Sequence, residues 1–173
     1  YILTKNSTMR LEITGVITLM SVVKNERIFV KTFDGFDVYV DGRIVYFPSG
    51  KAKEMLAVLV EKKGSSVSLA QMAYLLYENS EETRARNTLR VVYHRLHRTL
   101  AEYEIADIVI KRRGSYAVDT DRFVCDFYEF IREQPAFLNA YSGTYMPEYP
   151  WARNMIPYLD NLYRRYSGQK LKE

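Results

Sequence analysis

The segment TRARNTLRVVYHRLHRTLA, residues 83–101, contains five arginines, two histidines and no carboxylate. Guanidinium and imidazole groups donate hydrogen bonds to phosphate oxygens and to the edges of bases, so this composition suits nucleic-acid binding. Leu89, Tyr93, Leu96 and Leu100 recur at steps of four, three and four, which places them on one face of a helix. We expect a helix anchored by this apolar face, with its basic side chains available to a nucleic-acid groove.

A second basic segment, IVIKRRGSYAV, follows at residues 108–118. Its apolar and polar residues alternate on both sides of Gly114, which is typical of a β-hairpin. Lys111, Arg112 and Arg113 stand at the expected tip, where charged residues are also common as a plain solvated turn. The position of the hairpin directly after the basic helix favours a recognition helix followed by a β-wing, the order found in winged-helix DNA-binding domains.

Ten side chains are the candidate DNA-binding residues. The first turns of a recognition helix enter the major groove most deeply, so its early residues are expected at base edges or nearby phosphates: Arg84, Arg86, Asn87, Arg90 and His94. The later cations are expected mainly at phosphates, with the wing able to reach the minor groove: Arg95, Arg98, Lys111, Arg112 and Arg113. Arg86 lies nearer the apolar face than the others, so pairing with an acid of the domain is an open alternative for it.

His94 and His97 are three residues apart, a spacing that two metal ligands can have. Flanking arginines would repel a divalent cation, and no cysteine or carboxylate lies nearby in the sequence, so we expect no metal and no cofactor. No set of nucleophile, base and acid stands out. The wing tip also lacks the spaced glycines and the Lys-Ser/Thr pair of a phosphate-cradling loop, so we expect no enzyme activity.

The overall composition is that of a soluble globular protein, with 173 residues, 47% apolar and 27% charged. The formal net charge of +4 is modest, but residues 28–80 carry six basic and six acidic side chains and residues 121–173 carry seven of each. The acid-free segment 83–101 therefore stands out against a balanced background. Charge alone leaves a plain solvated face as an equal alternative.

The single cysteine, Cys125, excludes an internal disulfide and fits a reducing cytoplasm. We expect it to be a small buried side chain. The apolar stretch Ile13–Val23 is shorter than the roughly 18–20 residues of a membrane span. The sequence therefore predicts a cytoplasmic protein that does not enter a membrane.

The remaining patterns predict an α+β fold. Turn pairs and alternating residues indicate three antiparallel strands, over 28–33, 36–40 and 43–47, with Asp41-Gly42 as the strongest hairpin signal. Caps and apolar spacing indicate two helices before the basic one, from Ser49 to Gly64 and from the capping box of Ser68 and Gln71 to Leu76. The predicted fold is a winged helix-turn-helix with an N-terminal antiparallel sheet, a C-terminal β-wing and a helical extension.

After Asp121 the pattern is helical again. One helix is marked by Val124, Phe127, Tyr128 and Ile131, and a second by Trp151, Met155, Tyr158 or Leu159, and Leu162. Pro157 must kink or interrupt the second helix. We expect this aromatic tail to pack on the winged helix or on the helix that carries Phe127 and Ile131.

Between Ile28 and Asp119 the chain resembles the OmpR/PhoB-type winged-helix effector domain of bacterial response regulators, and most closely its SARP-like branch. The matching segments are FDGFDVYVDG at 33–42, SGKAKEMLAVLV at 49–60, NTLRVVYHRLHR at 87–98 and GSY at 114–116. The tail, with YSG at 141–143 and WA at 151–152, resembles the start of a BTAD-like activation region. Residues 1–23 resemble the last strand and helix of a receiver domain, with Lys5 in place of the switch lysine and Asn6 where that pattern has proline.

The resemblance implies three parts: a receiver-domain remnant or linker over 1–26, a winged-helix DNA-binding domain over 27–120, and a BTAD-like extension over 121–173. It implies a sequence-specific DNA-binding transcription regulator, the effector part of a two-component response regulator. Double-stranded DNA is the implied partner, with RNA polymerase or a second copy of the chain at the tail. The acidic pocket and phosphoacceptor aspartate of a receiver are not in this sequence, so a signal is expected to enter elsewhere.

The alternative is a winged helix that serves as a protein-interaction or dimerisation module without DNA binding. The aromatic tail and the modest net charge favour that alternative.

Overall fold

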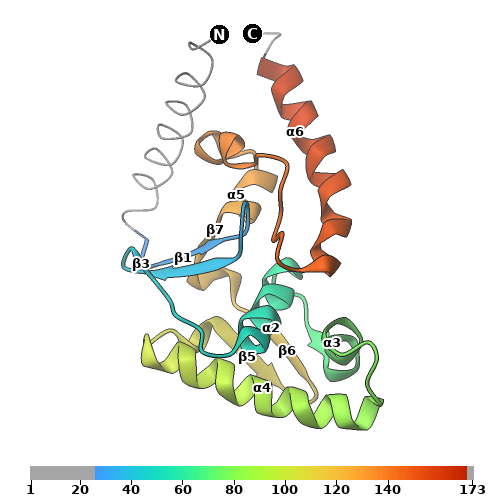
Figure 1. Cartoon of the computed structure of the whole chain (residues 1–173). Coiled ribbons are helices and arrows are strands. Elements are labelled where there is room, and N and C mark those ends of the chain that lie inside the picture. The colour runs from blue at the N-terminus through green and yellow to red at the C-terminus, as the bar shows by residue number, and fades with distance from the viewer. Residues whose placement is uncertain (1–25, 171–173) are drawn as a thin grey trace, which may run out of the picture. The chain divides into compact units, whose positions relative to one another are not determined.

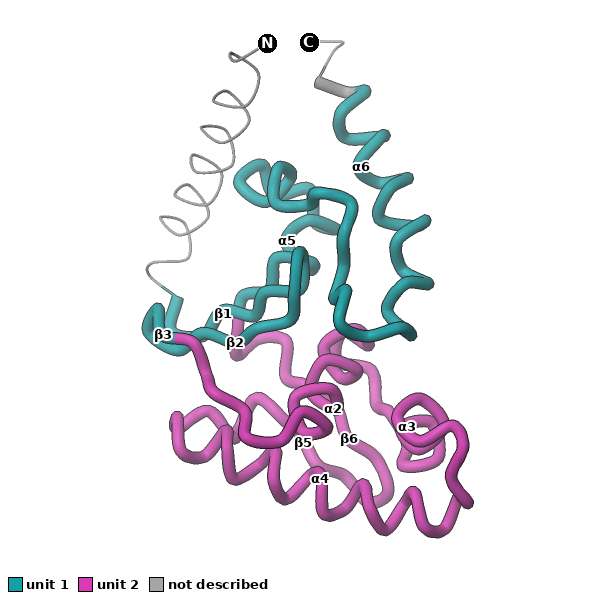
Figure 2. Tube along the Cα trace, in the orientation of Figure 1, with its two compact units in different colours: residues 1–43, 124–173 teal, residues 44–123 magenta. Residues whose placement is uncertain are grey.

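The structure is a computed structural model that describes residues 26–170 (Figure 1). It forms two compact units, coloured separately in Figure 2: residues 44–123 form one, and residues up to 43 form the other together with those from 124 onward. The receiver-like segment predicted over residues 1–23, with Lys5 and Asn6, lies outside the described residues. The domain boundaries predicted after residues 26 and 120 remain predictions.

The structure mixes helices with small sheets, which agrees with the predicted α+β class. The unit of residues 44–123 contains α2 (Gly50–Glu61), β4 (Val67–Ser68), α3 (Leu69–Leu76), α4 (Glu82–Glu102), η1 (Ala106–Ile108), β5 (Val109–Arg112), β6 (Ser115–Val118) and η2 (Thr120–Arg122). The other unit contains β1 (Ile28–Lys31), β2 (Asp37–Val40), β7 (Val124–Cys125), α5 (Asp126–Ile131), η3 (Pro135–Ala140), η4 (Pro150–Met155) and α6 (Ile156–Lys170). β3 (Arg43–Ile44) lies at the boundary, and η denotes a 3-10 helix.

Local sequence signals set the starts of two helices in the 44–123 unit. The Ser49 hydroxyl accepts a hydrogen bond at 3.3 Å from the backbone amide three residues later, at the start of α2. Ser68 and Gln71 form the predicted capping box at α3, with both reciprocal bonds present. Because each cap satisfies backbone amides that lack a partner inside the helix, these starts could be predicted from the sequence.

An apolar core joins the three helices of this unit. The predicted face of α4 is buried, at 0% exposure for Leu89, Leu96 and Leu100 and 6% for Tyr93. α2 and α3 both pack against α4. Burial of one large apolar side chain stabilises a fold by about 1.5–3 kcal/mol, so this face holds α4 firmly in its unit.

The β5–β6 hairpin is the predicted wing, and β4 pairs with the free side of β6. Arg112 lies opposite Ser115, which leaves Arg113 and Gly114 as a two-residue turn. Gly114 has φ +76°, in the left-handed region that favours glycine. Its carbonyl accepts a hydrogen bond at 3.1 Å from the amide of Leu69, the first residue of α3. The tip of the wing is thereby tied to the start of α3.

The sheet of the other unit has the strand order β3-β2-β1-β7. β1 and β2 pair antiparallel, with Ile28 opposite Val40, as predicted. The sheet also contains a strand that the sequence did not predict, since β7 pairs with β1 in parallel, with Phe29 opposite Val124. The sequence pattern also predicts a helix that includes Val124, but the helix begins only at Asp126.

The last predicted strand, 43–47, is much shorter than expected. The turn before it is confirmed, since Asp41 and Gly42 have φ of 50° and 75°, the positive values that a type I′ turn requires. β3 nevertheless ends at Ile44. The backbone amide of Tyr46 donates a hydrogen bond to the Tyr103 hydroxyl at 3.1 Å, so the chain has left the sheet by that point.

The predicted strand 28–33 also ends two residues early, because its last amides bond to a carboxylate. The amides of Thr32 and Phe33 donate to Asp126 at 2.8 and 3.1 Å, and the Thr32 hydroxyl donates at 2.6 Å. Asp126 is 1% exposed and also accepts from the amide of Phe127 at 2.8 Å. Burial raises the pKa of Asp126 above its ordinary value, and these hydrogen bonds act in the opposite direction. Asp126 thus joins β1 to α5.

The tail packs on α5, which confirms one of the two positions predicted for it. The Tyr166 ring lies 5.4 Å from that of Phe130 in an edge-to-face arrangement, and the Tyr166 hydroxyl donates to the Ile131 carbonyl at 3.3 Å. Leu159 and Leu162 are buried on α6. Together these contacts place α6 within the unit of β1 and α5.

The structure decides between two pairs of alternatives for the predicted tail helix. The helix is interrupted and not kinked near Pro157, because η4 ends at Met155 and Pro157 is the second residue of α6, a position where a helix leaves the backbone N–H without a partner. Of the two residues predicted for the apolar face, Leu159 is buried and Tyr158 is 45% exposed. Trp151 belongs to the separate 3-10 helix η4, where it is half-buried and stacks on Tyr149 with ring centroids 5.4 Å apart.

Candidate nucleic-acid interface

α4 presents two chemically different faces within its unit. In Figure 1, α2, α3 and the β5–β6 hairpin all lie on the same side of this helix. The side chains that it buries there are Ala85, Leu89, Val92, Tyr93, Leu96, Thr99 and Leu100. The other side carries exposed residues alone, which leaves it open to a ligand.

We call this second side the exposed face of α4. Its members are Arg84, Asn87, Thr88, Val91, His94, Arg95 and Arg98, all exposed. At about 100° of rotation per residue, they project within about 60° of the direction of Val91. Five of these are among the predicted site residues, and the fold brings those five together on one surface.

Thr88 and Val91 are not among the predicted site residues, because the prediction rests on cations and amides. Val91 is 51% exposed in the middle of the exposed face. Thr88 lies one helical turn after Arg84, and its hydroxyl donates a hydrogen bond to the Arg84 carbonyl at 2.9 Å. The signal that could have found them is the helical spacing itself, since positions 84, 88, 91, 95 and 98 form one continuous stripe.

Arg90 borders the exposed face on the side of the wing. Its Nη1 donates a hydrogen bond to Asn87 Oδ1 at 2.6 Å, and both side chains are exposed. Guanidinium groups pair with guanine and amide groups with adenine in the major groove. The two side chains therefore form one polar unit with the chemistry for reading base edges.

Arg86 occupies a different environment from the other predicted arginines. It is half-buried and its Nη2 lies 2.5 Å from Glu82 Oε1, one turn earlier on α4. Its Nε is buried and has no hydrogen-bond partner among the described residues. The ion pair is the alternative considered for Arg86 from the sequence, and a direct contact of Arg86 with DNA stays a prediction.

The three wing cations differ in orientation. The Lys111 ammonium lies 5.0 Å from the centroid of the Tyr93 ring, so it is directed at α4. Arg112 and Arg113 are exposed beside the turn and form no ion pair with any other residue in the described part of the chain. These two guanidinium groups are the ones that a phosphate could reach without breaking an existing contact.

Two tyrosines lie where the wing meets α4. The rings of Tyr93 and Tyr116 have centroids 4.6 Å apart. Burial raises the pKa of both hydroxyls, and the positive charge of Arg90 acts against this shift at Tyr116. Both hydroxyls therefore stay neutral beside the cations and add no negative charge near the exposed face.

His94 and His97 are both exposed, with ring centroids 5.8 and 6.0 Å from that of Tyr93. Among residues 26–170, no three histidine, cysteine, aspartate or glutamate side chains come together in a way that could hold a metal ion. None of the helices in the same range has both the length and the apolar character needed to cross a bilayer.

Comparisons with known proteins match the fold alone. No protein-family model matches the sequence, and no curated protein matches it. Among solved structures, the chain is similar to Mycobacterium tuberculosis EmbR in complex with a low-affinity phosphopeptide, with a TM-score of 0.69 and 15% identity over 83% of this chain. The chain spans 44% of the length of that EmbR chain. This likeness supports the predicted winged-helix fold.

Proposed function

We propose that the chain is a sequence-specific double-stranded DNA-binding regulator of transcription, with α4 as its recognition helix. The observation that carries this proposal is the exposed face of α4, which combines Arg84, Arg95 and Arg98 with polar and apolar side chains and has no carboxylate between residues 84 and 98. Glu102, at the end of α4, continues the same side of the helix one turn later. An α-helix with side chains is about 10–12 Å across, and the major groove is about 12 Å wide. Because its opposite face is buried in the core, α4 can enter the groove without unfolding.

Different parts of the exposed face suit different contacts with DNA. Asn87 and Arg90 have the donors and acceptors for base edges, with Val91 beside them. Apolar side chains contact the methyl group of thymine in the major groove, and we assign that role to Val91. Arg95 and Arg98 lie further along the helix and hold phosphates.

The wing supplies the second set of contacts. Arg112 and Arg113 neutralise phosphates, or enter the minor groove where a narrow A·T tract concentrates negative potential. The turn is held by the hydrogen bond between Leu69 and Gly114, so its position relative to α4 is set before DNA binds. This preorganisation reduces the entropy lost on binding.

The finer features of the proposal come from the resemblance to OmpR/PhoB-type effector domains. In that proposal the chain belongs to a cytoplasmic two-component response regulator. Its helical tail, from η3 to α6, contacts RNA polymerase or a second copy of the chain.

The test is selection of bound duplexes from a random pool, with the bound fraction sequenced. We expect enrichment of one short motif by the wild-type chain. A triple variant of the exposed face, with Arg84, Arg95 and Arg98 all replaced by glutamine, should lose this enrichment.

The matched control replaces the same number of exposed arginines in the other unit. It changes Arg132, Arg164 and Arg165 to glutamine, so its net charge equals that of the first variant. We expect the control to retain the motif. No enrichment by a folded wild-type chain would favour the protein-interaction module instead.

A further inference from the structure

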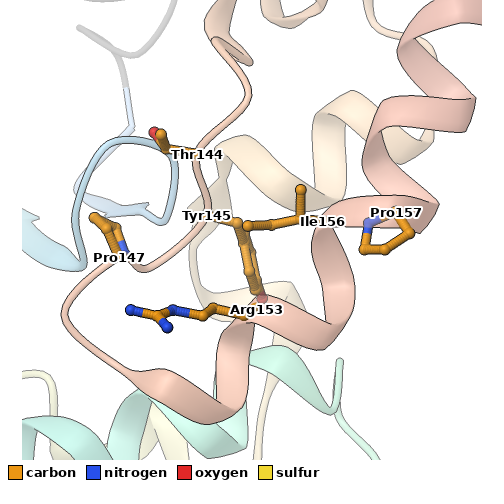
Figure 3. Close-up of a pocket in the computed structure, with 6 residues that line it drawn as sticks. All are labelled: Thr144, Tyr145, Pro147, Arg153, Ile156 and Pro157. Atoms are coloured by element: carbon orange, nitrogen blue, oxygen red, sulfur yellow. The ribbon is translucent and has the colours of Figure 1, made fainter.

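A surface hollow of about 330 Å³ opens in the unit that contains α5 and α6. It is formed by the loop before η4 and by the junction of η4 with α6. Its lining residues are Thr144, Tyr145, Pro147, Arg153, Ile156 and Pro157, drawn in Figure 3. Nothing in the proposed DNA interface uses these residues.

The lining combines an apolar wall with one positive charge. The accessible wall is made by Pro147, Ile156 and Pro157, because Tyr145, which also lines the hollow in Figure 3, is only 1% exposed. Arg153 is exposed and forms no ion pair or hydrogen bond with any other side chain in residues 26–168. No carboxylate is among the lining residues, so an anion would meet attraction without repulsion inside the hollow.

The loop that forms the wall is held in place by its own contacts. The hydroxyls of Ser142 and Thr144 both donate to the carboxylate of Asp34. The amide of Met146 donates to the Thr32 carbonyl at 2.8 Å, and the Tyr145 ring lies 5.1 Å from that of Phe127. A ligand would therefore find this wall largely preformed, which is typical of small-molecule sites.

We propose that this hollow binds a small apolar monocarboxylate. The carboxylate pairs with the Arg153 guanidinium, which offers two parallel N–H donors to such a group. The apolar body lies on Pro147, Ile156 and Pro157. The volume is at the low end for small-molecule sites, so an arylacetic acid is a ligand of suitable size. The proposal does not depend on DNA binding, and either can fail without the other.

The test uses phenylacetate and its neutral analogue phenylacetamide as probes, titrated into the whole ¹⁵N-labelled chain. We expect phenylacetate to shift the amides of residues 144–146 and 153–156 in a saturable way, with a Kd of about 1 mM or tighter. Phenylacetamide should bind at least about tenfold more weakly, because it cannot form the ion pair.

Two arginine variants separate the site from general ion pairing. Arg153→Gln should reduce phenylacetate binding to the level of the amide, while its dispersed spectrum shows an intact fold. Arg164→Gln removes an exposed arginine of α6 outside the hollow and should leave binding unchanged. The proposal is overturned if neither probe gives saturable shifts, if both bind equally, or if the two variants weaken binding to the same extent.

Discussion

The ring of Tyr93 in α4 and the ring of Tyr116 in β6 lie 4.6 Å apart, inclined by 30°. Aromatic pairs at this separation contribute about 0.5–1.5 kcal/mol beyond the burial of their area. Lys111 from β5 lies over the same Tyr93 ring at 5.0 Å. α4 and the β5–β6 hairpin are therefore coupled. In the proposed complex, α4 seated in the major groove determines where the hairpin meets the DNA backbone.

The coupling leads to a prediction for the wing. Replacing Arg112 and Arg113 with alanine should weaken binding to selected and scrambled duplexes alike, because phosphate contacts carry no sequence information. The plot of log K against log salt should become shallower by about one unit for each phosphate that the variant no longer neutralises. Fluorescence anisotropy across a salt series measures this slope. An unchanged slope would show that the wing does not touch DNA.

The hydrogen bond between Asn87 and Arg90 predicts that the two side chains act together. Each alanine variant should lose about 1–3 kcal/mol of affinity for the selected duplex while keeping its affinity for scrambled duplex. The double variant should lose less than the sum, with a coupling of at least about 0.5 kcal/mol. Competition binding with the wild type, the two single variants and the double variant measures this coupling in a double-mutant cycle. Strict additivity would mean that the bond between Asn87 and Arg90 is irrelevant to recognition.

Val91 provides a test that does not remove a cation. Val91→Glu places a carboxylate in the middle of the exposed face, where it would repel phosphates, so affinity for any duplex should fall at least about tenfold. Tyr74→Glu is the matched control, because Tyr74 is a 72% exposed apolar side chain on α3. Equal effects of the two substitutions would remove the exposed face of α4 from the interface.

Asp126 carries the stability prediction. Asp126→Ala leaves the buried donors of Thr32, Phe33 and Phe127 without an acceptor, so the free energy of unfolding should fall by about 3 kcal/mol or more. Asp126→Asn keeps one acceptor oxygen and should lose less. Asp121→Ala, at an exposed position, should stay within about 0.5 kcal/mol of wild type. Urea unfolding followed by circular dichroism compares the three, and a wild-type midpoint for Asp126→Ala would contradict the role assigned to this carboxylate.

Much of the 44–123 unit could be predicted because its signals are local. The capping box of Ser68 and Gln71 and the apolar stripe through Leu89 and Leu96 each depend on residues three or four apart. The wing follows from a short alternation around Gly114. Such patterns can be recognised without knowing what packs against them.

The features that the sequence does not predict depend on contacts between distant segments. Thr32 and Asp126 are 94 residues apart, and no local pattern indicates that the aspartate ends β1. The parallel pairing of β7 with β1 also joins segments that lie far apart in the sequence. Val91 escapes prediction for a different reason, since an apolar residue on a helix is expected to be buried, and only the packing shows that it is exposed.

The most direct measurement of the central claim is the affinity of the wild-type chain for a selected duplex and for a scrambled duplex of the same length, followed by anisotropy across about 50–200 mM salt. We predict a preference for the selected duplex of at least about 10³-fold. Affinity for both should fall with salt, with a log–log slope of about −3 to −5 from Arg84, Arg95, Arg98 and the wing arginines. Equal affinity for the two duplexes, or an affinity independent of salt, would contradict recognition of DNA by α4.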